Sequence, residues 1–172
     1  MIIGPKVSIM VVTYNHENFI SDALDSMVLQ DYENLEIVVS DDASADRTPE
    51  IIRDYEQRYP GRVKAFVNEK NLGITGNCNQ ALFACDGELV AFCSGDDLCL
   101  PGRISAQVAF LQSNPDCVMC YSATETFNSE TGKTIAVLNG SSEEKEISAE
   151  DMLRCGGTGF VGSSAMLRRI NI

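Results

Sequence analysis

The sequence predicts an α/β fold: a doubly wound, mostly parallel sheet followed by a small antiparallel α+β extension. Two observations support this prediction. Four short apolar runs are each followed by a segment whose apolar residues recur at helical spacing, and the pattern changes to that of paired strands after about residue 114. Alternating strands and helices build a parallel sheet covered by helices. The 172 residues, of which 44% are hydrophobic, are enough for one domain with its own core.

Four strand–helix units fill the first part of the chain. Strands are predicted at residues 7–12, 35–39, 63–67 and 89–93, and helices from Glu17, from Thr48, after Gly73 and after Pro101. Uninterrupted apolar runs are typical of strands that are buried on both faces of a sheet. Thr48 is expected to cap the second helix with its hydroxyl, and Pro49 suits the first turn of that helix.

The second part is predicted to contain two antiparallel strands. They span residues 117–127 and 134–138 and are joined by a polar turn at 128–133. A polar, acidic loop at 140–146 follows, and Ser148 with Asp151 then forms a capping box for a short helix.

The composition excludes one class of ligand and indicates a location. With 25 acidic and 13 basic side chains the formal net charge is −12, so the protein repels polyanions and nucleic acid is not an expected partner. The longest apolar runs are too short to cross a bilayer and do not have the layout of a secretory signal. We expect a cytoplasmic protein, in peripheral contact with the inner face of the membrane only through regions outside this sequence.

The seven cysteines lie mostly within apolar segments, which indicates reduced thiols that pack as small core residues. Cys117 and Cys120 have C-x-x-C spacing, but positions three apart in a strand face opposite sides. We therefore expect no zinc or redox site there.

Polar side chains follow three of the predicted strands, at the edge where an open α/β sheet binds its ligand. These segments are Thr13-Tyr14-Asn15, Asp41-Asp42 and Ser94-Gly95-Asp96-Asp97. Together they supply an aromatic face, hydrogen-bonding groups and two pairs of carboxylates. Carboxylates that lie close together repel one another unless a cation joins them, and a divalent ion held by one or two carboxylates and by substrate phosphates is a common solution. The pattern predicts a site for a nucleoside diphosphate and its metal.

Each of these features also has a purely structural interpretation. Asp41-Asp42 is equally typical of a turn or a helix cap, Tyr14 of a packed turn aromatic, and Asn71-Leu72-Gly73 of a strand-to-helix turn rather than a contact to the nucleotide. His16 is the single histidine, and without a second histidine or a cysteine nearby it is interpreted as a loop residue.

Four segments of the chain resemble the family-two glycosyltransferases, which have the GT-A fold. The family's amino-terminal signature is similar to VSIMVVTYNHENFISDALDSMVLQDYENLEIVVSDDASADRT, from Val7 to Thr48. Its central helix and its metal-binding segment are similar to NLGITGNCNQAL (71–82) and GELVAFCSGDDLCLPGRI (87–104). The strand that precedes its catalytic region is similar to GSSAMLRR (162–169). The resemblance is close as far as Asn114 and weaker beyond it.

The resemblance implies an inverting transferase that moves a sugar from a nucleotide-diphosphate sugar to a glycan or lipid-linked acceptor, in polysaccharide or glycoconjugate synthesis. A UDP-sugar is the favoured donor. Residues 1–172 would form one GT-A domain, with a nucleotide-binding core at 1–114 and the start of the acceptor-side region at 115–172.

The resemblance also implies roles for individual residues. Tyr14 would pack on the base, the Asp41-Asp42 pair would hydrogen-bond the base with Asp42 favoured, and Asp96 would lie near the ribose or the diphosphate. The residues expected at the donor are Thr13, Tyr14, Asn15, Asp41, Asp42, Gly73 and Asp96. Asp97, with Asp96, would hold Mn²⁺ or Mg²⁺ across the two phosphates.

Two departures from the family pattern stand out. Ser94 occupies the first acidic position of the family's commonest D-x-D motif, which weakens a contact to the ribose or sugar but leaves the metal-holding position intact. The family's general base follows the strand that resembles 162–169, whereas Glu150 and Asp151 precede it. We therefore expect the base beyond Ile172, in a longer protein of which this chain is the part that binds the donor but transfers sugar poorly.

Two other functions compete with a glycosyltransferase. A sugar nucleotidyltransferase is expected to carry a glycine-rich, basic loop after its first strand, and Thr13-Tyr14-Asn15-His16 contains neither glycine nor lysine. A nucleotide-binding regulatory or scaffold module without transferase activity is favoured by the missing base, and nucleotide binding without a metal would support it.

Overall fold

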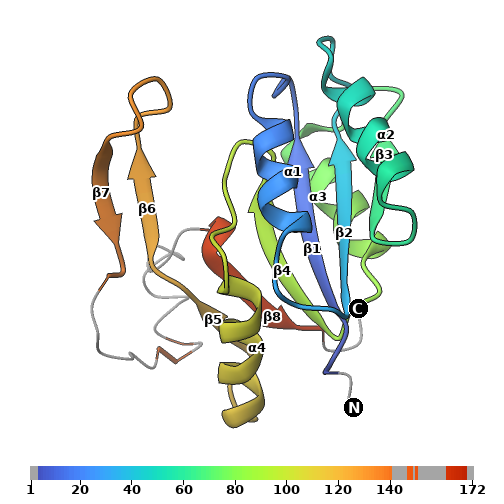
Figure 1. The fold of residues 1–172 in the computed structure, drawn as a ribbon. Coiled ribbons are helices and arrows are strands. Elements are labelled where there is room, and N and C mark those ends of the chain that lie inside the picture. Colours follow the sequence, from blue (N-terminus) through green and yellow to red (C-terminus); the bar gives the residue numbers. More distant parts are fainter. Residues whose placement is uncertain (1–3, 141–146, 149, 151–161, 170–172) are drawn as a thin grey trace.

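The computed structural model describes residues 4–140, 147–148, 150 and 162–169. Its main sheet has six strands in the order β3-β2-β1-β4-β8-β5 (Figure 1). The parallel part consists of β1 (Val7–Thr13), β2 (Leu35–Asp41), β3 (Val63–Val67) and β4 (Leu89–Ser94). The helices are α1 (Ile20–Val28), α2 (Thr48–Arg58), α3 (Gly73–Ala84) and α4 (Arg103–Ser113). The predicted α/β class and all four strand–helix units are confirmed.

Helices cover both faces of the sheet, with α1 and α2 in front of it and α3 behind it in Figure 1. Successive strand residues point to opposite faces. Ile9 and Ile37 therefore pack in the same cluster as α1, α2 and α4, whereas Met10 and Val38 pack with α3. Burial on both faces explains why the strand sequences are apolar without alternation.

Two predicted helix starts differ from the structure. The first helix begins at Ile20 rather than Glu17, because the backbone N–H groups of Phe19 and Ile20 both donate to the carbonyl of His16 and form a turn first. Thr48 does not cap the second helix with its hydroxyl. Asp46 Oδ1 instead accepts from the Thr48 backbone N–H at 2.9 Å, which leaves the hydroxyl to accept from the backbone N–H of His16 at 2.9 Å. Pro49 is in the first turn, as predicted.

The predicted strand at 117–127 is wrong, because the structure divides it between two sheets. β5 (Met119–Tyr121) pairs with β8 (Ala165–Arg168), which lies antiparallel between β4 and β5 and follows a short 3₁₀ turn, η1 (Gly162–Ser164). Ser122 N–H donates to the carbonyl of Ser164, and the chain then leaves the main sheet. β6 (Thr124–Phe127) pairs with β7 (Thr134–Leu138), as the predicted hairpin requires.

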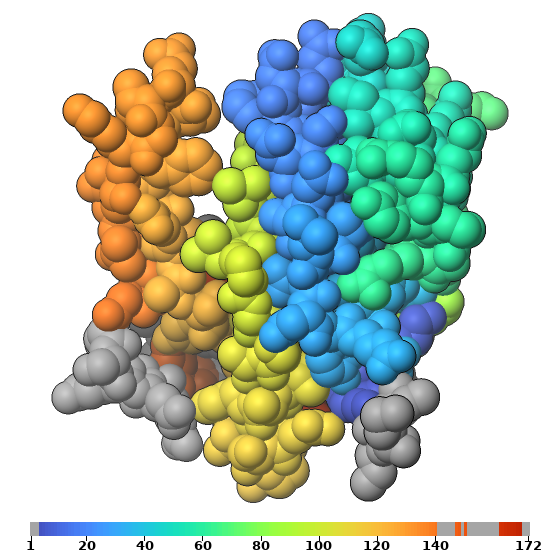
Figure 2. Space-filling view, viewed as in Figure 1, coloured from blue at the N-terminus to red at the C-terminus, as the bar shows by residue number. Residues whose placement is uncertain are grey.

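The β6–β7 hairpin stands beside the main body, and its turn points the same way as the carboxyl ends of β1 and β2 (Figures 1 and 2). The acidic loop at 140–146 and the short helix after Ser148 lie almost wholly outside the described residues. No helix in the described part of the chain has the length and hydrophobicity needed to cross a membrane.

A buried carboxylate joins the amino ends of the central strands. Glu36, 1% exposed, accepts from the Ser8 hydroxyl at 2.5 Å and from the Asp86 backbone N–H at 2.7 Å. Its other oxygen lies 2.7 Å from the Lys6 ammonium and 3.0 Å from that of Lys64. Burial alone would raise the pKa of Glu36, but these hydrogen bonds outweigh it and hold the pKa at about 2.

We predict that Glu36→Gln lowers the free energy of unfolding by about 2 to 3 kcal/mol at neutral pH, because the charged form is stabilised only in the folded state. The folded pKa of about 2 lies below the ordinary value of 4.5, so this contribution is present above pH 4.5 and disappears as the pH falls toward 2. Urea unfolding of both proteins at pH 7 and pH 3 measures it. Glu50→Gln, at an exposed ion pair, is the control; an equal loss at both pH values would contradict the prediction.

Candidate active site

The candidate site lies where the direction of the sheet connections reverses. The connections from β1 through β2 to β3 run toward one edge with α1 and α2 on one face, and α3 then returns on the other face to β4, on the far side of β1. Open α/β sheets bind their ligands in the crevice outside the strand ends at such a switch point. The segments after β1 and β4 meet here, and Gly95 N–H donates to the carbonyl of Val12 at 2.9 Å.

The loop after β1 presents Tyr14 and uses Asn15 to hold the next loop. Tyr14 is 47% exposed. Asn15 has a φ of 55°, a left-handed conformation that asparagine tolerates. Its backbone N–H donates to the Ser44 hydroxyl at 2.8 Å, and its Oδ1 accepts from the Ala45 N–H at 2.9 Å. The Asn15 side chain therefore joins the loops after β1 and β2, while the Tyr14 ring is available to a ligand.

The two aspartates at the end of β2 are buried, and both accept hydrogen bonds from backbone N–H groups. Asp41 Oδ2 accepts from the Ser44 backbone N–H at 2.9 Å and Oδ1 from the Ser44 hydroxyl, which closes the turn. Asp42, 4% exposed, accepts from the backbone N–H of Leu72 at 2.6 Å through Oδ1. The turn role considered for this pair is thus present at Asp41, whereas the carboxylate of Asp42 reaches a distant segment of the chain. Asp42 additionally anchors the start of α3 at the edge of the site.

The turn before α3 is built from Asn71 and Gly73. Asn71 donates through its side chain to the carbonyl of Asp42 at 3.2 Å and accepts from the Gly73 N–H at 3.0 Å. Gly73 has a φ of 72°, which strains any residue with a Cβ. Gly73 thus forms a strand-to-helix turn, which is the structural interpretation given above. This turn brings the start of α3 to the strand ends.

Sequence reasoning missed Asn77, a buried amide on α3. Its Oδ1 accepts from the Ser40 hydroxyl at 2.6 Å and from the Asn68 amide at 3.1 Å. Its Nδ2 donates to the carbonyls of Ser40 at 3.0 Å and Thr13 at 3.4 Å. The signal in the sequence is a polar residue four positions before Ala81, on the buried side of the helix. Asn77 fixes α3 to the ends of both β1 and β2.

The turn after β4 presents both of its carboxylates. Asp96 and Asp97 are exposed, and the Asp97 backbone N–H donates to the carbonyl of Ser94 at 3.2 Å. Gly95 lies against Thr13, since a Cβ at Gly95 would stand 2.6 Å from Thr13 Oγ1. The absence of a side chain at Gly95 lets this turn lie directly on the end of β1.

The Asp96-Asp97 pair has the donor chemistry of a divalent-cation site that is completed by a ligand. In the described ranges no three His, Cys, Asp or Glu side chains converge into a metal cage. Such a cage is not required, because Mg²⁺ and Mn²⁺ prefer oxygen donors and are often held by one or two carboxylates together with substrate phosphates. The residues fit an ion that binds with a diphosphate.

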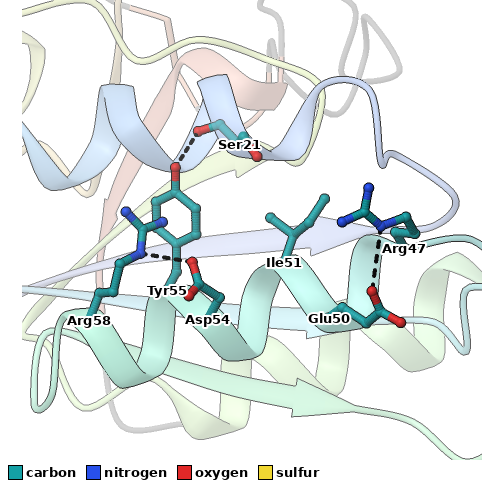
Figure 3. A pocket seen from close by; sticks show the side chains of 7 residues that line it. All are labelled: Ser21, Arg47, Glu50, Ile51, Asp54, Tyr55 and Arg58. Carbon is teal, nitrogen blue, oxygen red and sulfur yellow. Dashed lines mark hydrogen bonds and ion pairs between the residues drawn. The ribbon is translucent and has the colours of Figure 1, made fainter.

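A groove of about 220 Å³ lies elsewhere, between α1 and α2 (Figure 3). Its polar side chains are largely paired with one another. Arg58 lies 2.8 Å from the Asp54 carboxylate, and the Tyr55 hydroxyl donates to the Ser21 carbonyl at 3.0 Å. The groove lies on the face of the sheet that α1 and α2 cover, and not at the strand ends. We assign it no part in ligand binding.

The comparison with known families agrees with this geometry. The sequence model of the family described as "Glycosyl transferase family 2" matches residues 8–171. The chain belongs to this family. Among its relatives is the putative glycosyltransferase EpsE of Bacillus subtilis, which is 33% identical over 94% of this chain and 58% of its own length. Another is the GalNAc(5)-diNAcBac-PP-undecaprenol beta-1,3-glucosyltransferase of Campylobacter jejuni, 38% identical over 59% of this chain and 33% of its own length.

Two solved structures share the fold. S. aureus TarS 1–349 in complex with UDP-GlcNAc has a TM-score of 0.59 and 33% identity, over 64% of this chain and 32% of that one. The mannosyltransferase PcManGT of Pyrobaculum calidifontis, in complex with GDP-Man and Mn²⁺, has a TM-score of 0.70 and 24% identity, over 96% of this chain and 45% of that one. The GT-A fold expected for the family-two chain is confirmed.

This chain is shorter than the proteins it matches. It spans 34% of the length of several curated relatives and 58% of the length of EpsE.

We predict that Asn77→Ala lowers the free energy of unfolding by about 2 to 4 kcal/mol, because several buried partners lose their hydrogen bonds at once. Chemical denaturation measures the change. Asn79→Ala, at an exposed position of the same helix, is the matched control and should have little effect. Equal stability of the two variants would show that the Asn77 amide does not hold the strand ends.

Proposed function

We propose that this chain is the nucleotide-sugar-binding part of an inverting, metal-dependent glycosyltransferase. It would use a nucleotide-diphosphate sugar, with a UDP-sugar favoured, and a glycan or lipid-linked acceptor, in polysaccharide or glycoconjugate synthesis. The observation that carries the proposal is that Tyr14 and the Asp96-Asp97 pair follow the ends of two adjacent strands, β1 and β4, at the switch point of a family 2 chain. The UDP-GlcNAc complex of TarS supports the choice of donor, and the undecaprenol-linked glycan named for the Campylobacter relative supports that of acceptor.

The proposed donor contacts follow from the positions of the side chains. The exposed Tyr14 ring would stack on the base, since aromatic rings bind other π-systems through their faces. Asp42, with Asp41 as the second candidate, would accept a hydrogen bond from the base. Thr13, Asn15 and Gly73 would shape the pocket through the turns that they hold.

The carboxylates after β4 would act on the diphosphate. Asp97, together with Asp96, would hold Mn²⁺ or Mg²⁺ against the two phosphates, and Asp96 would also approach the ribose. A divalent ion bound there supplies positive charge that stabilises the departing nucleoside diphosphate. The contribution of this chain is to present the two exposed carboxylates in a hydrogen-bonded turn at the end of β4.

We predict that UDP binds this chain in the presence of Mn²⁺ and that Asp97→Ala weakens this binding by about 100-fold, because the ion loses its main protein ligand. Isothermal titration with and without Mn²⁺ measures both effects. Asp54→Ala, which removes an exposed carboxylate on α2, is the matched control. Equal UDP affinity without the metal, or an unchanged Asp97→Ala variant, would favour a nucleotide-binding module without transferase chemistry.

The stacking role of Tyr14 can be tested separately. Tyr14→Leu should weaken UDP binding by about tenfold, because base stacking on an aromatic ring contributes about 1 to 3 kcal/mol. Tyr14→Phe keeps the ring and should bind within about twofold of the original chain, on the same reasoning. Fluorescence or calorimetric titration with UDP measures both variants, and equal losses for Leu and Phe would assign the effect to the hydroxyl instead.

A further inference from the structure

His16 and Ser94 contact Asp96 from two sides, and neither has a part in the donor contacts proposed above. The Ser94 hydroxyl donates to Asp96 Oδ1. His16 Nε2 lies 3.8 Å from Asp96 Oδ2. The two oxygens of the Asp96 carboxylate therefore face two different groups, one from the end of β4 and one from the loop after β1. The Asp96 side chain is nevertheless 47% exposed, which leaves it accessible to a ligand.

The His16 ring is held in place by its own loop. Its backbone N–H donates to Thr48 Oγ1 at 2.9 Å, and its carbonyl accepts from the N–H groups of Phe19 and Ile20 at the start of α1. The ring packs edge-on against Phe19, with centroids 6.5 Å apart and planes at 83°. The direction of Nε2 toward Asp96 is thus a consequence of the way the β1 loop is tied to α1 and α2.

The second nitrogen of the ring indicates which atom carries the proton. His16 Nδ1 is buried against Gly95, where a Cβ would stand 3.1 Å from it, and it has no hydrogen-bond partner among the described residues. A buried nitrogen without a partner is better left as an acceptor than as an unsatisfied N–H donor. The neutral ring therefore places its N–H on Nε2, the atom that faces Asp96.

We infer that His16 and Ser94 are positioning residues that orient the Asp96 carboxylate toward the donor's diphosphate and its metal. This inference rests on the proposed function. The distance of 3.8 Å exceeds a hydrogen bond, and a rotation of the exposed Asp96 side chain closes it. Such contacts commonly tighten when a ligand binds. Ser94 gives Asp96 a hydroxyl donor from the end of β4, and a hydrogen bond to a charged carboxylate is stronger than one between neutral groups.

The test compares two replacements of His16. His16→Gln keeps an N–H donor at about the position of Nε2, whereas His16→Phe keeps the ring and removes the donor. Binding of UDP in the presence of Mn²⁺ is measured by calorimetry, and thermal unfolding shows whether each variant is folded. We expect His16→Phe to weaken binding by about tenfold, as for one lost hydrogen bond to a charged group, and His16→Gln to stay within about threefold of the original chain on the same scale.

The outcomes separate the two proposals. Suppose that the original chain binds UDP with Mn²⁺ and that Asp97→Ala does not. If His16→Phe then binds UDP normally, or if His16→Gln binds as weakly as His16→Phe, the positioning role is wrong and the donor site stands. If His16→Phe is not folded, Ser94→Ala decides, because the loss of a partly exposed hydroxyl leaves the packing intact; unchanged affinity in that variant overturns the inference. If the original chain binds neither UDP nor GDP, both proposals fail.

Discussion

The geometry of the site depends on one buried amide. Asn77 is the point at which α3, from the rear face of the sheet, is tied to the last residues of β1 and β2, and its four hydrogen bonds use both its oxygen and its nitrogen. A buried polar group of this kind costs free energy unless every partner is present, so it specifies one arrangement of the strand ends. The loops that carry Tyr14 and Asp42 start from backbone that this amide holds in position.

The acidic residues at the edge of the site differ in what they are free to do. Asp41 and Asp42 are buried and accept hydrogen bonds from backbone N–H groups, of Ser44 in the following turn and of Leu72 before α3, whereas Asp96 and Asp97 are exposed. In the proposed site the first pair would hold the loops and offer Asp42 to the base, whereas the second pair would meet the metal and the diphosphate. This division lets a chain with a net charge of −12 carry two pairs of carboxylates at the ends of β2 and β4: backbone N–H groups stabilise the first pair, and exposure to solvent stabilises the second.

Local patterns predicted most of the fold and the positions of the candidate site residues, because uninterrupted apolar runs, glycine turns and helical spacing are all properties of neighbouring residues. What they could not predict are contacts between distant segments. The sequence predicted a helix cap for the Thr48 hydroxyl, but this hydroxyl accepts a hydrogen bond from the backbone N–H of His16, 32 residues earlier. His16 looked like an ordinary loop residue because its partner Asp96 follows a different strand. The break after Tyr121 depends on β8, whose sequence comes more than 40 residues later.

The position of β8 also has a consequence for the order in which the protein folds. β1 to β4 find their partners among themselves, so this part of the sheet can form as soon as α4 emerges to cover it. Among the described residues β5 pairs only with β8, which is synthesised later and lies between β4 and β5, so β5 cannot join the sheet until β8 is present. During synthesis the edge of β4 therefore stays open, and with it an unpaired strand that chaperones or other nascent chains can reach.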